Sequence, residues 1–129
     1  MAKYLDGAGL ATLWGKIKAA DTAVVNSFPK FQFGTYTGAN ADGSTNALSL
    51  TFSFVPKMVF IHAGSVVGVF TPASLTSSYK SSGYAVNSEG GGSSDYAKFS
   101  GTTLSWYSTY NKLHHLNSGS TVYQWFAIG

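Results

Sequence analysis

Apolar residues near the start of the chain recur at alternating intervals of three and four positions. This spacing is typical of a helix that packs one face against a partner. The positions in this apolar stripe are Leu10, Leu13, Ile17, Ala20 and Val24. Asp6 is a suitable N-cap and Pro29 a suitable stop, so the pattern predicts a helix from about Gly7 to Asn26 or Ser27.

From Phe31 onward, apolar and polar residues alternate between glycine, proline and polar stretches, as in β-strands. The expected strands cover residues 31–37, 48–54, 58–62, 66–71, 84–86, 96–100, 103–107 and 122–128. Gly101 is expected to join the strands on either side of it in a hairpin. Residues 58–62 are apolar on both faces, which predicts a central strand. Residues 39–46, 72–82, 89–94 and 111–120 are expected to be polar connections.

The fold class that follows is mainly β: an N-terminal α-helix in residues 1–28, followed by an antiparallel β-sandwich in residues 29–129. Because no second helix follows, the apolar stripe is expected to lie on its own β domain, on another copy of the chain or on another protein. The spacing favours other copies of the chain, whose helices would pack together in a short helical bundle. The residues expected to carry oligomerisation and attachment are Leu10, Leu13, Trp14, Ile17, Ala20 and Val24.

Composition narrows the class of protein. A chain of 129 residues is the size of one domain, and only 10% of its residues are charged, against about a quarter in typical globular domains. Hydroxyl and amide groups must therefore cover much of the exterior, which suits virion proteins, extracellular β-proteins and carbohydrate binders. The net charge of +3 comes from scattered lysines without any arginine, which argues against nucleic-acid binding. The absence of cysteine excludes disulfides and thiolate metal sites.

Targeting and membrane signals are not expected. The first six residues lack an apolar segment of the kind that signal peptides contain. No apolar run approaches the roughly 20 residues that a membrane helix needs. We therefore expect synthesis in a cytoplasm and no membrane insertion.

Four segments resemble proteins of bacteriophage virions. Residues 4–18 (YLDGAGLATLWGKIK) resemble the N-terminal segment of tail-fibre and other virion proteins of phages and prophages in gut bacteria. Residues 34–38 (GTYTG), 54–61 (FVPKMVFI) and 118–129 (SGSTVYQWFAIG) are similar to the C-terminal β domain of phage fibres. No shaft or repeat separates these parts, which favours a short surface fibre on a baseplate or capsid over a long tail fibre.

The resemblance implies a virion structural protein at the virion surface, made in the bacterial cytoplasm. It also implies a homotrimer that contacts other virion proteins and adheres to a bacterial-surface glycan. Two alternatives stay open: a capsid head fibre or decoration protein with a purely structural role, and a free carbohydrate-binding module.

Catalysis is not expected. A glycosidase needs two carboxylates held about 5–10 Å apart. Only Glu89 and Asp95 are close in sequence, and they flank a solvated Gly/Ser loop that would support a preorganised pair poorly. No Gly-x-Ser-x-Gly nucleophile motif is present. We therefore expect no enzyme activity and no cofactor.

The histidines allow two interpretations. In a trimer, one histidine of the pair His114–His115 from each copy could surround a metal ion on the three-fold axis. The favoured interpretation is an exposed loop pair that stacks on an aromatic ring or hydrogen-bonds a ligand, with no metal bound. His62 is expected to be a hydrogen-bonded residue of the core or of an interface.

Aromatic side chains next to amides and hydroxyls predict a sugar-binding surface, because sugars offer C–H faces for stacking and hydroxyls for hydrogen bonds. Leu104, Trp106 and Tyr110 are expected on one face of a strand and Tyr107 on the other. Trp106 is expected in the core, and Tyr123 with Trp125 in the core or a subunit interface. The expected ligand-binding residues are Tyr107, Tyr110, Asn111, His114, His115 and Asn117.

Overall fold

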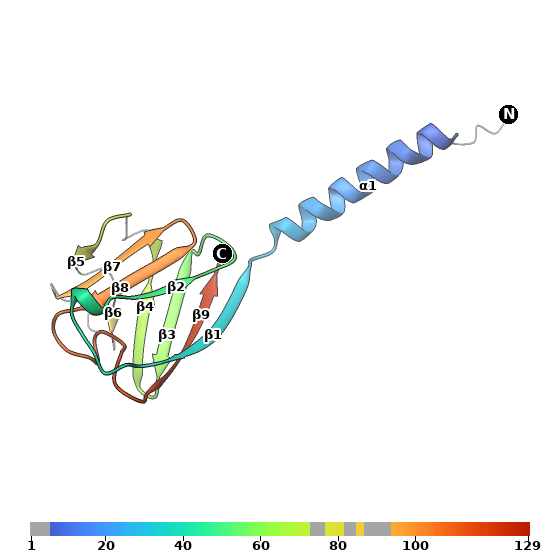
Figure 1. Ribbon diagram of the computed structural model, residues 1–129. Coiled ribbons are helices and arrows are strands. Elements are labelled where there is room, and N and C mark those ends of the chain that lie inside the picture. The colour runs from blue at the N-terminus through green and yellow to red at the C-terminus, as the bar shows by residue number, and fades with distance from the viewer. Residues whose placement is uncertain (1–5, 73–76, 82–84, 87–93) are drawn as a thin grey trace.

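The protein is mainly β with one N-terminal helix. The computed structural model describes residues 6–72, 77–81, 85–86 and 94–129 (Figure 1). The elements are α1 (Gly7–Ser27), β1 (Phe31–Thr37), the short 3-10 helix η1 (Ser44–Asn46), β2 (Leu48–Thr51), β3 (Met58–Ala63), β4 (Val66–Phe70), β5 (Lys80–Ser81), β6 (Ala85–Val86), β7 (Asp95–Ser100), β8 (Thr103–Ser108) and β9 (Val122–Ile128).

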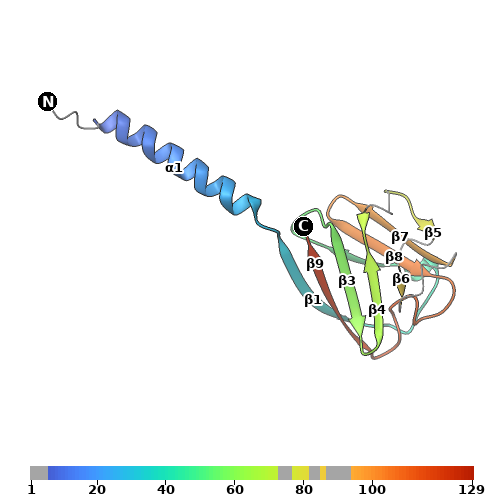
Figure 2. The same cartoon turned by 180° about the vertical axis from the view of Figure 1, so that it is seen from behind.

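Helix α1 has the predicted bounds and caps. The Asp6 carboxylate accepts a hydrogen bond from the Gly9 amide at 2.7 Å, and the chain is extended at Phe28, just before Pro29. The helix, about 30 Å long at 1.5 Å per residue, projects away from the strands as a separate arm (Figures 1 and 2). None of its side chains is buried. The alternative in which the apolar stripe covers the chain's own β domain is therefore wrong.

The strands form two antiparallel sheets. The five-stranded sheet has the order β1-β9-β3-β4-β6, and the four-stranded sheet has the order β2-β8-β7-β5. β3 lies between β9 and β4, which confirms the predicted central strand. β1 pairs with β9, so the C-terminal Gly129 exchanges backbone hydrogen bonds of 2.8 and 3.0 Å with Lys30. The end of the chain therefore lies beside the point where the helical arm joins the sheet (Figure 2).

The inward faces of the two sheets share one apolar cluster. Trp106 on β8 lies at its centre, with its ring 5.5 Å from Phe70 on β4 and 6.0 Å from Tyr36 on β1. Trp106 and Tyr123 are buried, and Trp125 packs against the same cluster, so their predicted core positions are confirmed. Leu116, from the loop between β8 and β9, is also fully buried there. This loop is therefore part of the core, and its neighbouring residues are held in place.

Strand boundaries differ from the prediction where the chain changes sheets. β2 ends at Thr51 instead of residue 54, because the chain then crosses toward β1, where the Ser53 amide donates to Gln32 Oε1 at 2.9 Å. Phe52 and Phe54 stay buried along this crossing. The two-residue strand β5 lies in a stretch expected to be a polar connection, where no apolar alternation marks it. The fifth strand expected from the sequence begins at Tyr84, which lies outside the described residues.

Candidate functional site

The two sheets expose outer faces of opposite chemistry. On β2, β7 and β8 the inward residues are apolar or buried, so the alternate positions point outward. We call this outer surface of the four-stranded sheet the hydroxyl face. Its residues are Ser49, Thr51, Tyr96, Lys98, Ser100, Thr103, Ser105 and Tyr107. Hydroxyl groups dominate it, and a single cation lies among them.

Three tyrosines and Lys98 form a cluster on the hydroxyl face. Tyr96 and Tyr107 are cross-strand partners whose rings stack at 4.7 Å, and Tyr79 meets the Tyr107 ring edge-on at 5.0 Å. Lys98 Nζ lies 4.4 Å from the centre of the Tyr79 ring. Tyr107 thus lies on the face opposite Trp106, as predicted. Burial, followed by the neighbouring phenols Tyr96 and Tyr79, raises the pKa of Tyr107 above its ordinary value.

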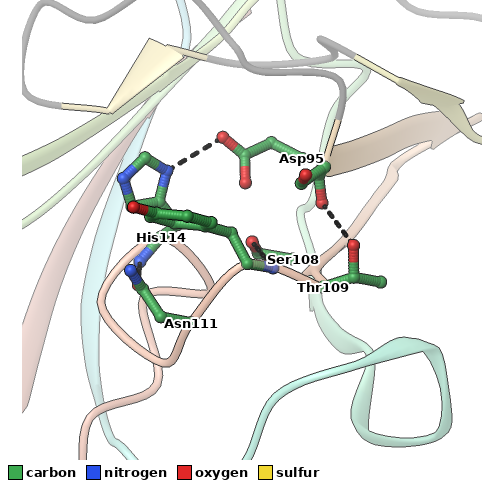
Figure 3. Close-up of polar contacts among 7 residues, drawn as sticks. Asp95, Ser108, Thr109, Asn111 and His114 are labelled. Carbon is green, nitrogen blue, oxygen red and sulfur yellow. Dashed lines mark hydrogen bonds and ion pairs between the residues drawn. The ribbon is translucent and has the colours of Figure 1, made fainter.

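A second cluster lies at the start of β7. Asp95 is buried, and its Oδ2 lies 3.1 Å from Nδ1 of His114, as Figure 3 shows. The other oxygen, Oδ1, has no hydrogen-bond partner among the described residues. The amide of His114 also donates to Asn111 Oδ1 at 2.8 Å, so the side chains of Asp95 and Asn111 together hold His114. The prediction that Asp95 belongs to a solvated loop is wrong, because it is the first residue of a paired strand.

Tyr110 is the most exposed member of the predicted ligand set, at 67%. Its ring meets the imidazole of His114 edge-on at 4.9 Å. β8 ends at Ser108. The prediction that Tyr110 lies on the same strand face as Leu104 and Trp106 is therefore wrong. Tyr110, Asn111 and His114 therefore lie together at the surface, beside a buried carboxylate.

His115 and Asn117 are buried, which contradicts their predicted exposure. His115 Nε2 donates a hydrogen bond to the Asn46 carbonyl at 3.1 Å. Asn117 accepts from the Ala39 amide at 2.7 Å and donates to the Ala41 carbonyl at 2.9 Å. Both side chains fasten the loop to the segment after β1. Their polarity suggested a ligand site, but it satisfies buried backbone groups.

The remaining sequence candidates are placed as follows. Glu89, the proposed partner of Asp95 in a carboxylate pair, lies outside the described residues. His62 is exposed on the outer side of β3, so its predicted core position is wrong, whereas an interface position stays a prediction. Among the described residues, no group of three or more His, Cys, Asp or Glu side chains could hold a metal ion. Within the same residues, no helix is long and apolar enough to span a membrane.

Comparisons with known proteins add no assignment. The chain matches no protein-family model, and no curated protein or solved structure is significantly similar to it. The site is therefore argued from its own residues.

Proposed function

We propose that this chain is a structural protein of a bacteriophage virion, made in the bacterial cytoplasm, that forms a short homotrimeric fibre on the virion surface. In this proposal the helices α1 form a bundle that also contacts other virion proteins. The two sheets form a β-sandwich head that is displayed outward and binds a bacterial-surface glycan. The resemblance of residues 4–18 and of three β segments to phage fibre proteins supports this class.

The exposed stripe of α1 carries the proposal. Leu10, Ile17 and Val24 are 54%, 42% and 55% exposed, and the helix buries nothing against its own head. Fully burying one such side chain stabilises a protein by about 1.5–3 kcal/mol, so a partner helix would gain several of these contributions. The three-four spacing matches the seam of helices that pack on copies of themselves. A solitary monomer would leave this whole stripe in water.

The hydroxyl face supports glycan adhesion, and so does the surface group formed by Tyr110, Asn111 and His114. Aromatic rings next to hydroxyl, amide and imidazole groups provide stacking and hydrogen bonding to sugars. Three heads on one bundle would bind a repeating surface glycan with far higher avidity than one head. A capsid fibre or decoration protein would share the architecture but would bind no cell. A free carbohydrate-binding module would bind as a monomer.

The first experiment is the absolute mass of the intact protein, measured by light scattering after size exclusion. Three times the chain mass of 13.6 kDa supports the fibre. A monomer at every concentration contradicts it.

The second experiment measures binding of the purified protein to bacterial cells and to a glycan array. We expect Tyr110→Ala to weaken the binding. Leu113→Ala, at an exposed position of the same loop, serves as the control. A trimer that binds no cell and no glycan overturns the adhesion part and leaves the structural role.

A further inference from the structure

The outer face of the five-stranded sheet is apolar, in contrast to the hydroxyl face. We infer that this apolar face is a second contact surface between copies of the chain, at which neighbouring heads meet once the helices have associated. The inference rests on the proposed trimer and adds an interface that the helix does not supply. The residues of the apolar face are Phe31, Phe33, Thr35, Thr37, Met58, Phe60, His62, Val67, Val69, Val122, Gln124, Phe126 and Ile128.

Strand register gathers the aromatic side chains of this face into one row. Phe33, Phe126 and Phe60 are partners across β1, β9 and β3, so their side chains lie side by side on the same face. The next row, toward the helix, joins Phe31, Ile128 and Met58 in the same way. Phe33 is 80% exposed, although it lies in a regular strand. Contiguous apolar surface of this kind marks an interaction site in a soluble protein.

The absence of charge on this face favours a second copy as its occupant. None of the residues of the apolar face is Asp, Glu, Lys or Arg. In a symmetric assembly equivalent patches come close together, and like charges on them would repel. A face without Asp, Glu, Lys or Arg avoids that cost, whereas it offers no carboxylate, ammonium or guanidinium group to a partner of different sequence. The hydroxyl face, in contrast, includes the cation of Lys98.

The short connection between helix and head also favours a second copy. Only residues 28–30 separate α1 from β1, a span of at most about 10 Å. Packed helices lie about 8–10 Å apart, so a bundle would hold the starts of its β1 strands close together. Tethering of this kind gives effective concentrations in the millimolar range, at which even a weak patch is occupied.

Exposed phenylalanines lie on both sides of the connection between the helical arm and the sheet. Phe28 is exposed at the end of α1, and the ring of Phe31 stacks on Phe126 at 5.7 Å. An open pocket of about 260 Å³ lies beside Phe33, lined also by His62 and Gln124. A pocket of this size has room for a side chain of the neighbouring copy. The end of the bundle and the apolar face would thus lie next to each other.

The test uses single cysteines, which the natural chain lacks. Gln124→Cys places a thiol in the apolar face, and Ser49→Cys places one on the hydroxyl face; both positions are exposed in the single chain. Maleimide labelling of each is measured in the intact oligomer and again with Ile17→Asp added to separate the copies. We expect Gln124→Cys to react about tenfold or more slowly in the oligomer than in the separated chain, because an interface opens only part of the time. Ser49→Cys should react at the same rate in both.

The outcomes separate this inference from the proposed function. Equal labelling of Gln124→Cys with and without Ile17→Asp, in a protein that is trimeric, overturns the inference and leaves the trimer intact. A protein that is monomeric at every concentration overturns both. If Gln124→Cys lowers the melting temperature, Thr35→Cys replaces it, because Thr35 is exposed and lies opposite Gln124 in the register.

Discussion

The indole Nε1 of Trp106 donates a hydrogen bond to the backbone carbonyl of His115 at 3.0 Å. This bond joins the centre of the core to the loop between β8 and β9. The phenol of Tyr36 donates to the next carbonyl, that of Leu116, at 2.8 Å. The loop that carries Tyr110 and His114 is therefore supported from below by the buried Trp106 and the partly buried Tyr36, and its surface side chains are presented on a fixed base.

The loop is also closely packed against the end of β1. A methyl group at Gly38 would overlap the backbone carbonyl oxygen of Ser118. The two segments cannot easily move apart, because the Gly38 amide also donates a hydrogen bond to the Thr121 carbonyl at 2.8 Å. We expect Gly38→Ala to destabilise the head by about 1–3 kcal/mol, as overpacked substitutions do. Thermal unfolding followed by circular dichroism measures the effect.

Gly15→Ala is the matched control. Nothing lies within 4 Å of the added methyl group on the exposed helix, where alanine is favoured over glycine by about 0.5–1 kcal/mol. Equal melting temperatures of Gly38→Ala and the wild type would contradict the packing of this loop.

The Asp95–His114 contact should contribute measurably to stability. A hydrogen bond to a charged group contributes about 1.5–3 kcal/mol, and Asp95 is almost completely buried. We expect a double-mutant cycle of Asp95→Asn and His114→Gln to give a coupling energy in this range from denaturant unfolding. The pair Asp21→Asn and His114→Gln is the control, because Asp21 lies on the helical arm and the two effects should add within about 0.5 kcal/mol. Strict additivity of the first pair would show that the contact contributes nothing.

Stability should depend on pH through His115. Burial lowers the pKa of this imidazole below its ordinary value of 6.5, although its hydrogen bond to the Asn46 carbonyl partly opposes the shift. The unfolded chain therefore binds a proton more readily than the folded one. The contribution of His115 to the free energy of unfolding is therefore fully present above pH 6.5. It is lost as the pH falls from 6.5 to the lower pKa of the folded state.

His115→Gln tests this linkage, since glutamine can donate the same hydrogen bond but does not titrate. We expect its melting temperature to change less between pH 7.5 and 5 than that of the wild type. The same slope in the wild type and in His115→Gln would exclude His115 as its source.

The helical stripe should determine the oligomeric state. Ile17→Asp puts a charge into the centre of the proposed seam, where burying it without a partner is costly. We expect this variant to have the mass of one chain while the strands keep their far-UV spectrum and cooperative unfolding. Thr22→Asp, five positions further along and away from the stripe, should keep the wild-type mass. An Ile17→Asp protein with unchanged mass would show that the stripe is not the seam.

The sequence alone determined the elements whose signals are local. Asp6, Pro29 and the three-four spacing defined α1, and alternation defined β1 and β9 to the exact residue, because capping, proline geometry and side-chain period act over a few residues. Gly101 likewise marked the β7–β8 hairpin, where it adopts a φ of 56°. The short strand β5, held mainly by its pairing with β7, carried no such signal.

Only the tertiary structure decided which polar residues are buried and which apolar residues are exposed. His115 and Asn117 looked like ligand residues, but they satisfy backbone groups about 70–80 positions away in the chain. Asp95 and His114 met because β7 and the loop after β8 adjoin in the fold. The contrast between the hydroxyl face and the apolar face arose in the same way. Alternation assigns each residue to one side of its strand, but the order and pairing of distant strands decide which sides together form a surface.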